Sequence, residues 1–225
     1  MAAEGPTAEA VPPQAPSRRL FFALWPDEDM RQAMLHAIRK AARASGGRPV
    51  PAANLHVTLA FLGAVPERRL GELGETARAA AAPGPTAAGA NPPGRPPSPA
   101  GTSEDSPASR LELAFDHLEY WRGAQLLCAL PAEPPAPVSA FARKLQDLLA
   151  GRGFAPDLKS SWSVELNISR PFRPHVTLAR NIHRSPRVMD MDPATWSFAD
   201  FVLMDSKTLP EGSVYTVLER FPFCH

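Results

Sequence analysis

The residues best suited to chemistry in this chain belong to an internal repeat of five residues. His56-Val57-Thr58-Leu59-Ala60 returns unchanged as His175-Val176-Thr177-Leu178-Ala179 in the other half of the chain. Each copy lies in a segment with the length and apolar content of a β-strand, where side chains alternate between two faces. Valine and leucine are therefore expected on the core face, and histidine and threonine on the opposite face. Two such strands can present two imidazoles and two hydroxyls to one cleft.

This set of side chains suits the hydrolysis of a cyclic phosphodiester. The reaction needs a base to activate water and an acid to protonate the departing sugar oxygen. Because the ordinary histidine pKa is near ~6.5, one imidazole can be neutral while another is protonated close to neutral pH. Threonine hydroxyls can donate hydrogen bonds to non-bridging phosphate oxygens. We take His56 and His175 as the acid–base pair, and the chemistry requires no metal or organic cofactor.

Two simpler interpretations of the repeat stay open. A single HxT tripeptide says little, because a histidine on a strand is more often structural than catalytic, so it is the repetition that favours chemistry. A purely structural strand repeat is one alternative. A zinc site with His56, His175 and a third ligand is the other, since zinc accepts imidazoles, but no carboxylate lies beside either motif at ligand spacing.

Composition narrows the class of protein. A formal net charge of +1 gives little overall electrostatic attraction to a nucleic-acid duplex or an anionic membrane. A binding site for a single phosphate is still compatible with this charge, because it needs only a few cationic side chains nearby. Cys128 and Cys224 have no CxxC spacing, which argues against a disulfide framework or a cysteine zinc site. No apolar run approaches the ~20 residues of a membrane span, and the N-terminus lacks the pattern of a secretory signal. We expect a cytoplasmic monomer with no membrane partner.

The 27 prolines indicate where the folded domain is interrupted. Residues 1–17 are rich in alanine, proline and glutamate and are predicted to be a disordered tail. Residues 18–225 are predicted to form a single domain. Within it, residues 82–109 are a proline-rich flexible insertion, because eight prolines remove backbone donors and no apolar stripe is present.

Hydrophobic periodicity predicts an α+β fold with antiparallel sheets. Helices are expected at residues 27–44, 66–80 and 138–149. Strands are expected at residues 18–25, 54–62, 111–115, 125–130, 164–168, 175–180, 198–204 and 214–218. The chain contains neither GxGxxG nor GxxxxGK[ST], which argues against a dinucleotide-binding fold and P-loop chemistry.

Three segments resemble the 2H phosphoesterase superfamily: Arg19–Leu24, Asn54–Gly63 and Arg170–Arg180. Within it, they look like the RNA 2′,3′-cyclic phosphodiesterase family, also called the LigT-like or 2′-5′ RNA ligase family. Ser206 and Val214-Tyr215-Thr216 also fit, and the resemblance spans about residues 18–220. It implies a bilobal fold of two pseudo-symmetric antiparallel sheets with flanking helices, with one HxT strand from each lobe lining a central cleft.

The resemblance also implies an activity, the hydrolysis of RNA-terminal 2′,3′-cyclic phosphate to a 2′-phosphomonoester. RNA ends or small cyclic nucleotides are the implied partners. It makes His56 the proton donor and His175 the proton acceptor, with Thr58 and Thr177 holding phosphate oxygens. This direction of proton transfer rests on the resemblance alone. RNA 2′-5′ end-joining at the same site, and a non-catalytic module that binds RNA ends, are the alternatives.

Two further side chains are candidates for binding. Arg173 lies two positions before His175 and can clamp a phosphate, or it is a solvent-facing charge, because Pro174 leaves the strand register open. Phe22 can stack on a terminal base or pack in the core. Arg180 is five positions after His175 and is expected on the opposite face. The insertion at residues 157–169, like that at 82–109, departs from the family pattern, and it can alter which RNA ends enter the site.

Overall fold

The computed structural model describes residues 16–44, 46–82, 110–154, 172–186, 189, 191–210 and 212–223. Most of the expected tail and of the 82–109 insertion lies outside the described residues. So do the whole 157–169 insertion and the strand expected at 164–168. None of the helices within the described residues has the length and apolar character needed to cross a bilayer.

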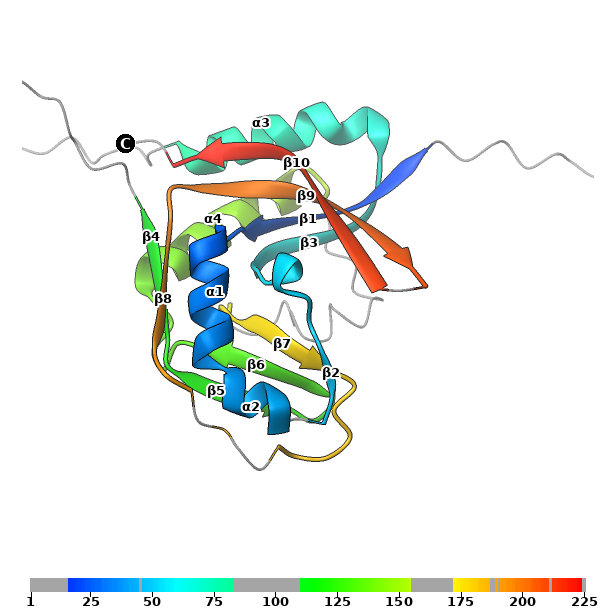
Figure 1. Cartoon of the computed structure of the whole chain (residues 1–225). Helices are drawn as coiled ribbons and strands as arrows, with labels where there is room; N and C mark the ends of the chain where they lie inside the picture. Colours follow the sequence, from blue (N-terminus) through cyan, green and yellow to red (C-terminus); the bar gives the residue numbers. More distant parts are fainter. Residues whose placement is uncertain are drawn as a thin grey trace, which may run out of the picture.

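An antiparallel sheet of eight strands forms the centre of the fold (Figure 1). The strand order is β10-β9-β1-β3-β7-β6-β5, and β2 pairs with β7 beside this path. The strands are β1 Ser17–Leu24, β2 Arg48–Pro49, β3 Val57–Pro66, β5 His117–Trp121, β6 Leu126–Leu130, β7 Val176–Arg180, β9 Asp200–Leu209 and β10 Gly212–Pro222. Two more strands, β4 Leu111–Phe115 and β8 Ala194–Phe198, form a separate antiparallel pair.

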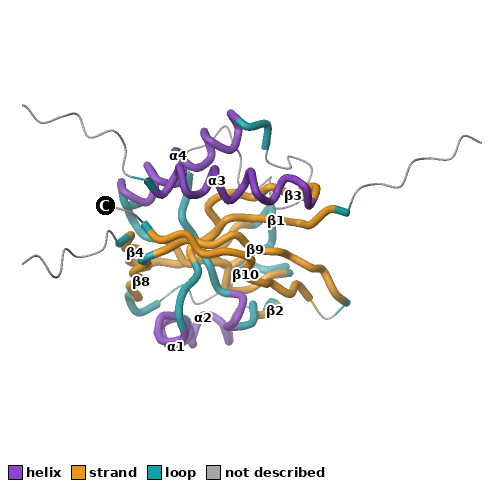
Figure 2. The backbone as a smooth tube through the Cα atoms, turned by 90° about the horizontal axis from the view of Figure 1, so that it is seen from above, coloured by secondary structure: helices purple, strands orange, loops and turns teal. Residues whose placement is uncertain are grey.

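Helices flank the strands in two groups. Figure 2 shows α3 (Leu70–Ala81) and α4 (Ala136–Gly151) on one side, and α1 (Glu28–Ala37) and α2 (Arg39–Ala44) on the other. Asp27 caps α1 by accepting a hydrogen bond of 2.8 Å from the Met30 backbone N–H. The helix expected at 27–44 is therefore confirmed in extent, but it is divided in two at Ile38.

The two halves of the large sheet meet through a single residue pair. β10-β9-β1-β3 forms one half, and β7-β6-β5 with β2 forms the other. Val57 of β3 pairs with Val176 of β7. Both valines are completely buried. The α+β class with antiparallel sheets is confirmed, and the structure adds that the halves join edge to edge at the valine of each repeat.

Both repeat copies contain a β-bulge at the same position. On β3, the partners of Phe22 and Ala23 are Ala60 and Thr58, so Leu59 is the extra residue. On β7, the partners of Leu127 and Cys128 are Ala179 and Thr177, so Leu178 is the extra residue. In each copy the leucine and the alanine are both buried in the main core. The bulge therefore interrupts the alternation that the sequence predicts.

The bulge reverses the side on which the next residue lies. Phe61, which follows the first copy, packs with Phe21 and Ala23 in a small cluster separate from the main core. Arg180, which follows the second copy, lines a cavity together with Thr177. The prediction that Arg180 faces away from the threonine is therefore wrong, because it assumed unbroken alternation along β7.

Three strands were missing from the sequence prediction. β2 has only two residues, and β5 has a single buried side chain, Leu118, so neither shows a period-two pattern. β8 does alternate, with Ala194, Trp196 and Phe198 buried. It is separated from β9 by only Ala199, which explains why the predicted strand at 198–204 began within β8.

The valine pair at the join is expected to contribute to stability. Val176→Ala removes buried methyl groups and should lower the free energy of unfolding by about 2 kcal/mol, measured by urea denaturation. Val214→Ala is a suitable control because Val214 is 47% exposed, and it should change the free energy by less than about 0.5 kcal/mol. Equal effects of the two substitutions would contradict this assignment of the join.

Candidate active site

The pairing of Val57 with Val176 determines how the two repeats face each other. Because the strands are antiparallel, one step along each strand from this pair places each histidine across from the threonine of the other copy. The facing pairs are His56 with Thr177, and Thr58 with His175. All four side chains lie on the face opposite the buried valines. A cavity of about 260 Å³ beside the join has both His56 and Thr177 in its lining, in agreement with this register.

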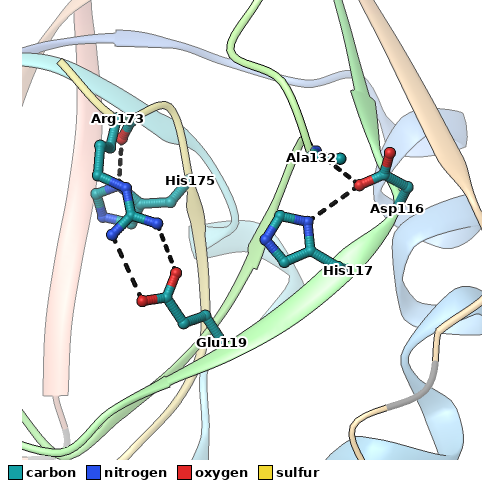
Figure 3. Close-up of polar contacts among 6 residues, drawn as sticks. All are labelled: Asp116, His117, Glu119, Ala132, Arg173 and His175. Atoms are coloured by element: carbon teal, nitrogen blue, oxygen red, sulfur yellow. Dashed lines mark hydrogen bonds and ion pairs between the residues drawn. The ribbon is translucent and has the colours of Figure 1, made fainter. Parts of the chain in front are cut away.

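Each histidine is held in the same way by its own strand. His56 Nδ1 lies 2.7 Å from the carbonyl oxygen of Asn54. His175 Nδ1 lies 2.9 Å from the carbonyl oxygen of Arg173, as Figure 3 shows. A carbonyl oxygen only accepts hydrogen bonds, so Nδ1 carries the proton in both neutral rings. Nε2 is then the atom that exchanges protons. The Nε2 of His56 lies 3.1 Å from Thr58 Oγ1, which donates to it.

Aromatic rings surround His56. The ring centroid of Phe21 is 5.2 Å away, that of Tyr215 is 5.4 Å away, and Trp25 stacks at 5.7 Å. Tyr215 comes from β10, and Trp25 directly follows β1. These contacts restrict the imidazole to one orientation and keep water from much of its surface.

His175 is enclosed by residues of β5 and by its own strand. Its ring centroid lies 4.6 Å from that of Trp121. Arg173 forms two contacts with Glu119, with Nη2–Oε2 at 2.6 Å and Nη1–Oε1 at 3.4 Å (Figure 3). The Arg173 guanidinium also lies 5.7 Å from the Trp121 ring centroid. Arg173 thus forms an ion pair with the Glu119 carboxylate. The expected contact between Arg173 and a phosphate stays a prediction.

The pKa of each histidine is lowered in the folded protein. Burial lowers the pKa of His56 to about 4, and the charges of Arg180 and His175 add to this effect, against the contrary influence of the Asn54 carbonyl. Burial also lowers the pKa of His175, with a contribution from the charge of Arg173, while the Arg173 carbonyl and Glu119 act in the opposite direction. Both rings are therefore expected to be neutral at pH 7 in the free protein.

The other predicted site residues separate into two groups. Thr58 and Thr177 lie partly exposed on the same face as the histidines. Phe22 is completely buried and packs against Phe201 and Phe221. The stacking prediction for Phe22 is therefore wrong, because strand alternation directs this side chain into the core and its neighbour Phe21 toward His56.

Sequence reasoning did not assign Tyr215, Trp25, Trp121 or Glu119 to the site. Tyr215 lies in one of the segments that carried the family resemblance, which was a usable signal. Trp121 and Glu119 belong to β5, which the sequence pattern did not reveal. Among the described residues no group of three or more histidine, cysteine, aspartate or glutamate side chains is placed to hold a metal ion.

Comparison with known proteins assigns the chain to a family. A family model described as the 2′-5′ RNA ligase superfamily matches residues 26–207. A Thermus thermophilus protein named RNA 2′,3′-cyclic phosphodiesterase is 32% identical over 208 residues, covering 90% of this chain and 89% of the relative. The chain belongs to the 2′-5′ RNA ligase superfamily. An Escherichia coli member with the same name is 28% identical, covering 91% of this chain and 96% of the relative.

Solved structures of the superfamily have the same fold. E. coli LigT complexed with 3′-AMP matches with a TM-score of 0.69 at 24% identity, covering 93% of this chain and all of that chain. The T. thermophilus protein TT0787 matches with a TM-score of 0.66 at 26% identity, covering 91% of this chain and 97% of that chain. The likeness extends over both halves of the fold.

The lowered histidine pKa values predict how stability depends on pH. Below pH ~6.5 the unfolded chain binds a proton at His56 that the folded protein does not bind. The contribution of His56 to the free energy of unfolding is therefore fully present above this pH and is lost as the pH falls toward 4. His56→Gln should make the fall in melting temperature between pH 7 and pH 5 shallower. His36→Gln on the exposed side of α1 serves as the control. Parallel curves for wild type and His56→Gln would contradict the lowered pKa.

Proposed function

We propose that this protein hydrolyses RNA-terminal 2′,3′-cyclic phosphates to 2′-phosphomonoesters, with His56 as the proton donor and His175 as the proton acceptor. One observation carries the proposal. The Val57–Val176 pairing brings the two HxT motifs to the same face of one sheet, with each histidine across from the threonine of the other motif. Both Nδ1 atoms donate to backbone carbonyls, which leaves Nε2 of each ring for proton transfer. At His56 the Thr58 hydroxyl, which donates to Nε2 in the free protein, must turn to a phosphate oxygen when substrate binds.

The reaction uses the two rings in opposite directions. His175 Nε2 accepts a proton from water as the water oxygen bonds to phosphorus. The bond between phosphorus and O3′ breaks, and His56 Nε2 gives its proton to O3′, which leaves the phosphate on O2′. His175 ends protonated and His56 neutral, and proton exchange with solvent restores the starting state. Thr58 and Thr177 donate hydrogen bonds to the non-bridging oxygens, where negative charge is held.

His56, the proton donor, must take up its second proton when the substrate binds. His56 has a pKa of about 4 in the free protein, so at pH 7 it carries the second proton only when a negative charge lies beside it. The phosphodiester supplies that charge and raises the pKa of the ring. Arg180 lines the same cavity as His56 and Thr177, and we expect its guanidinium to bind a phosphate oxygen there.

The relatives support this assignment of substrate. The matched proteins of T. thermophilus and E. coli are both named RNA 2′,3′-cyclic phosphodiesterase. Structures of E. coli LigT were determined with 3′-AMP and with ATP. RNA ends and small cyclic nucleotides are therefore the substrates we propose. We further propose that the protein acts on them as a cytoplasmic monomer and without a metal ion.

Joining of RNA ends is the second candidate, because the matched family is described as a 2′-5′ RNA ligase superfamily. Hydrolysis and joining share the pentavalent phosphorus and differ only in the nucleophile, which is water or the 5′-hydroxyl of another RNA. Water is present at far higher concentration, so we expect hydrolysis to dominate. Turnover with water alone and turnover with an added 5′-hydroxyl RNA separate the two activities.

Loss of either histidine should abolish most of the activity. His56→Ala and His175→Ala are each expected to lower kcat for 2′,3′-cyclic AMP by ~10²–10⁴, because each removes a proton-transfer group. His36→Ala is the control, and the product of the wild type should be 2′-AMP. Retention of activity within a few-fold of wild type would refute the two-histidine mechanism. Binding without any product would favour a module that only recognises RNA ends.

Proton uptake on binding can identify the donor. At pH 7, a non-hydrolysable cyclic phosphonate analogue of the substrate should bind with uptake of about one proton, because its fixed negative charge raises the pKa of the donor ring. Calorimetry in two buffers of different ionisation enthalpy measures this uptake. His56→Gln should lose the uptake and His175→Gln should keep it. The opposite pattern would exchange the roles of the two histidines.

A further inference from the structure

A second, much smaller depression lies next to His56. It has a volume of about 30 Å³, and its lining combines Arg19 with hydroxyl groups of β3, β9 and β10. The hydroxyl-bearing side chains are Thr58, Ser206, Thr208, Ser213 and Tyr215. No acidic side chain within the described residues lines it. We call this set, with Arg19, the Arg19 subsite.

Strand register brings these side chains together. Leu20 pairs with Asp205, so Arg19 lies across from Ser206, one step further along both strands. Ser206 is paired with Tyr215 of β10, and Thr208 is paired with Ser213. The side chains therefore form two cross-strand rows on the face of the sheet that carries His56. They continue the apolar cluster of Phe21 and Phe61 toward the tip of the β9–β10 hairpin.

The neighbouring arginine makes the placement of Arg19 informative. Arg18 points to the opposite face, where its Nε lies 2.8 Å from Glu67 and its Nη1 lies 3.4 Å from Asp205. The guanidinium of Arg19 instead lies 5.0 Å from the ring centroid of Phe61, and the described residues provide it with no carboxylate partner. The charge of Arg18 is therefore neutralised by carboxylates of the protein, whereas Arg19 lines a depression together with hydroxyl groups.

A guanidinium that lines a depression together with hydroxyls, and that has no carboxylate partner among the described residues, is suited to an anion, and its planar fork fits phosphate. The depression is shallow, whereas the cavity of about 260 Å³ that also includes His56 offers much more room for a nucleobase. With the cyclic phosphate held at the histidines, the terminal nucleoside has one other attachment point, its 5′ oxygen. In RNA that oxygen carries the preceding phosphodiester.

We propose that the Arg19 subsite binds the phosphate on the 5′ oxygen of the terminal nucleoside, which in RNA is the last internucleotide linkage. The proposal rests on the proposed function. It makes the enzyme selective for the end of an RNA chain over a free nucleoside 2′,3′-cyclic phosphate, because only the former presents a second phosphate.

The test compares kcat/KM for the dinucleotide ApA with a 2′,3′-cyclic phosphate and for adenosine 2′,3′-cyclic phosphate. Wild type should prefer the dinucleotide by roughly tenfold or more, as expected for a charge-assisted hydrogen bond. Arg19→Met should remove most of this preference, and Arg19→Lys should keep part of it. Arg18→Met is the matched control on the opposite face, and it should retain the wild-type preference. Thermal unfolding of each variant checks that the fold is intact.

A dinucleotide with a neutral methylphosphonate linkage isolates the charge. Wild type should treat it much as it treats the mononucleotide, and Arg19→Met should cause little further loss, because the same interaction is already missing. A preference for the dinucleotide that survives Arg19→Met, or that Arg18→Met reduces equally, would overturn the proposal. Failure of the proposed function is a different result, because wild type would then turn over none of these substrates.

Discussion

One backbone pairing between two short strands holds the site together. Val57 and Val176 form the only described residue pair between β3 and β7, and both side chains are removed from water. The pairing sets the spacing of the strands, and antiparallel geometry then decides which side chains face each other. A shift of one residue would leave the two histidines on opposite faces of the sheet, with one of them turned toward the core. Burial of the two valines therefore fixes the register on which the chemistry depends.

The protein controls its histidines through the backbone. In both motifs the carbonyl two residues before the histidine accepts from Nδ1, so each strand sets the tautomer of its own ring. Aromatic side chains then enclose the rings, with Tyr215 and Trp25 beside His56 and Trp121 beside His175. Burial lowers both pKa values, which makes proton gain dependent on an arriving negative charge.

The two halves repeat the same backbone but provide different chemistry. The bulge turns Phe61 toward the site in the first half and Arg180 in the second. One half therefore offers an apolar ring that supports Arg19, and the other offers a cation beside Thr177. The two strands thus have nearly the same backbone but different side chains after the repeat. This difference between the halves suits a reaction in which one histidine gives a proton and the other accepts one.

The amino-acid pattern was enough to predict the two HxT strands, the α+β class, most helices and the position of both histidines, because these follow from local periodicity and an identical repeat. Three-dimensional packing was needed to show that His56 faces Thr177, that Phe22 is buried and that Arg180 shares the face of Thr177. It also supplied Trp121 and Glu119, from a strand with one buried residue. Register, bulges and contacts between distant strands arise from the packing of the whole sheet, which no local pattern encodes.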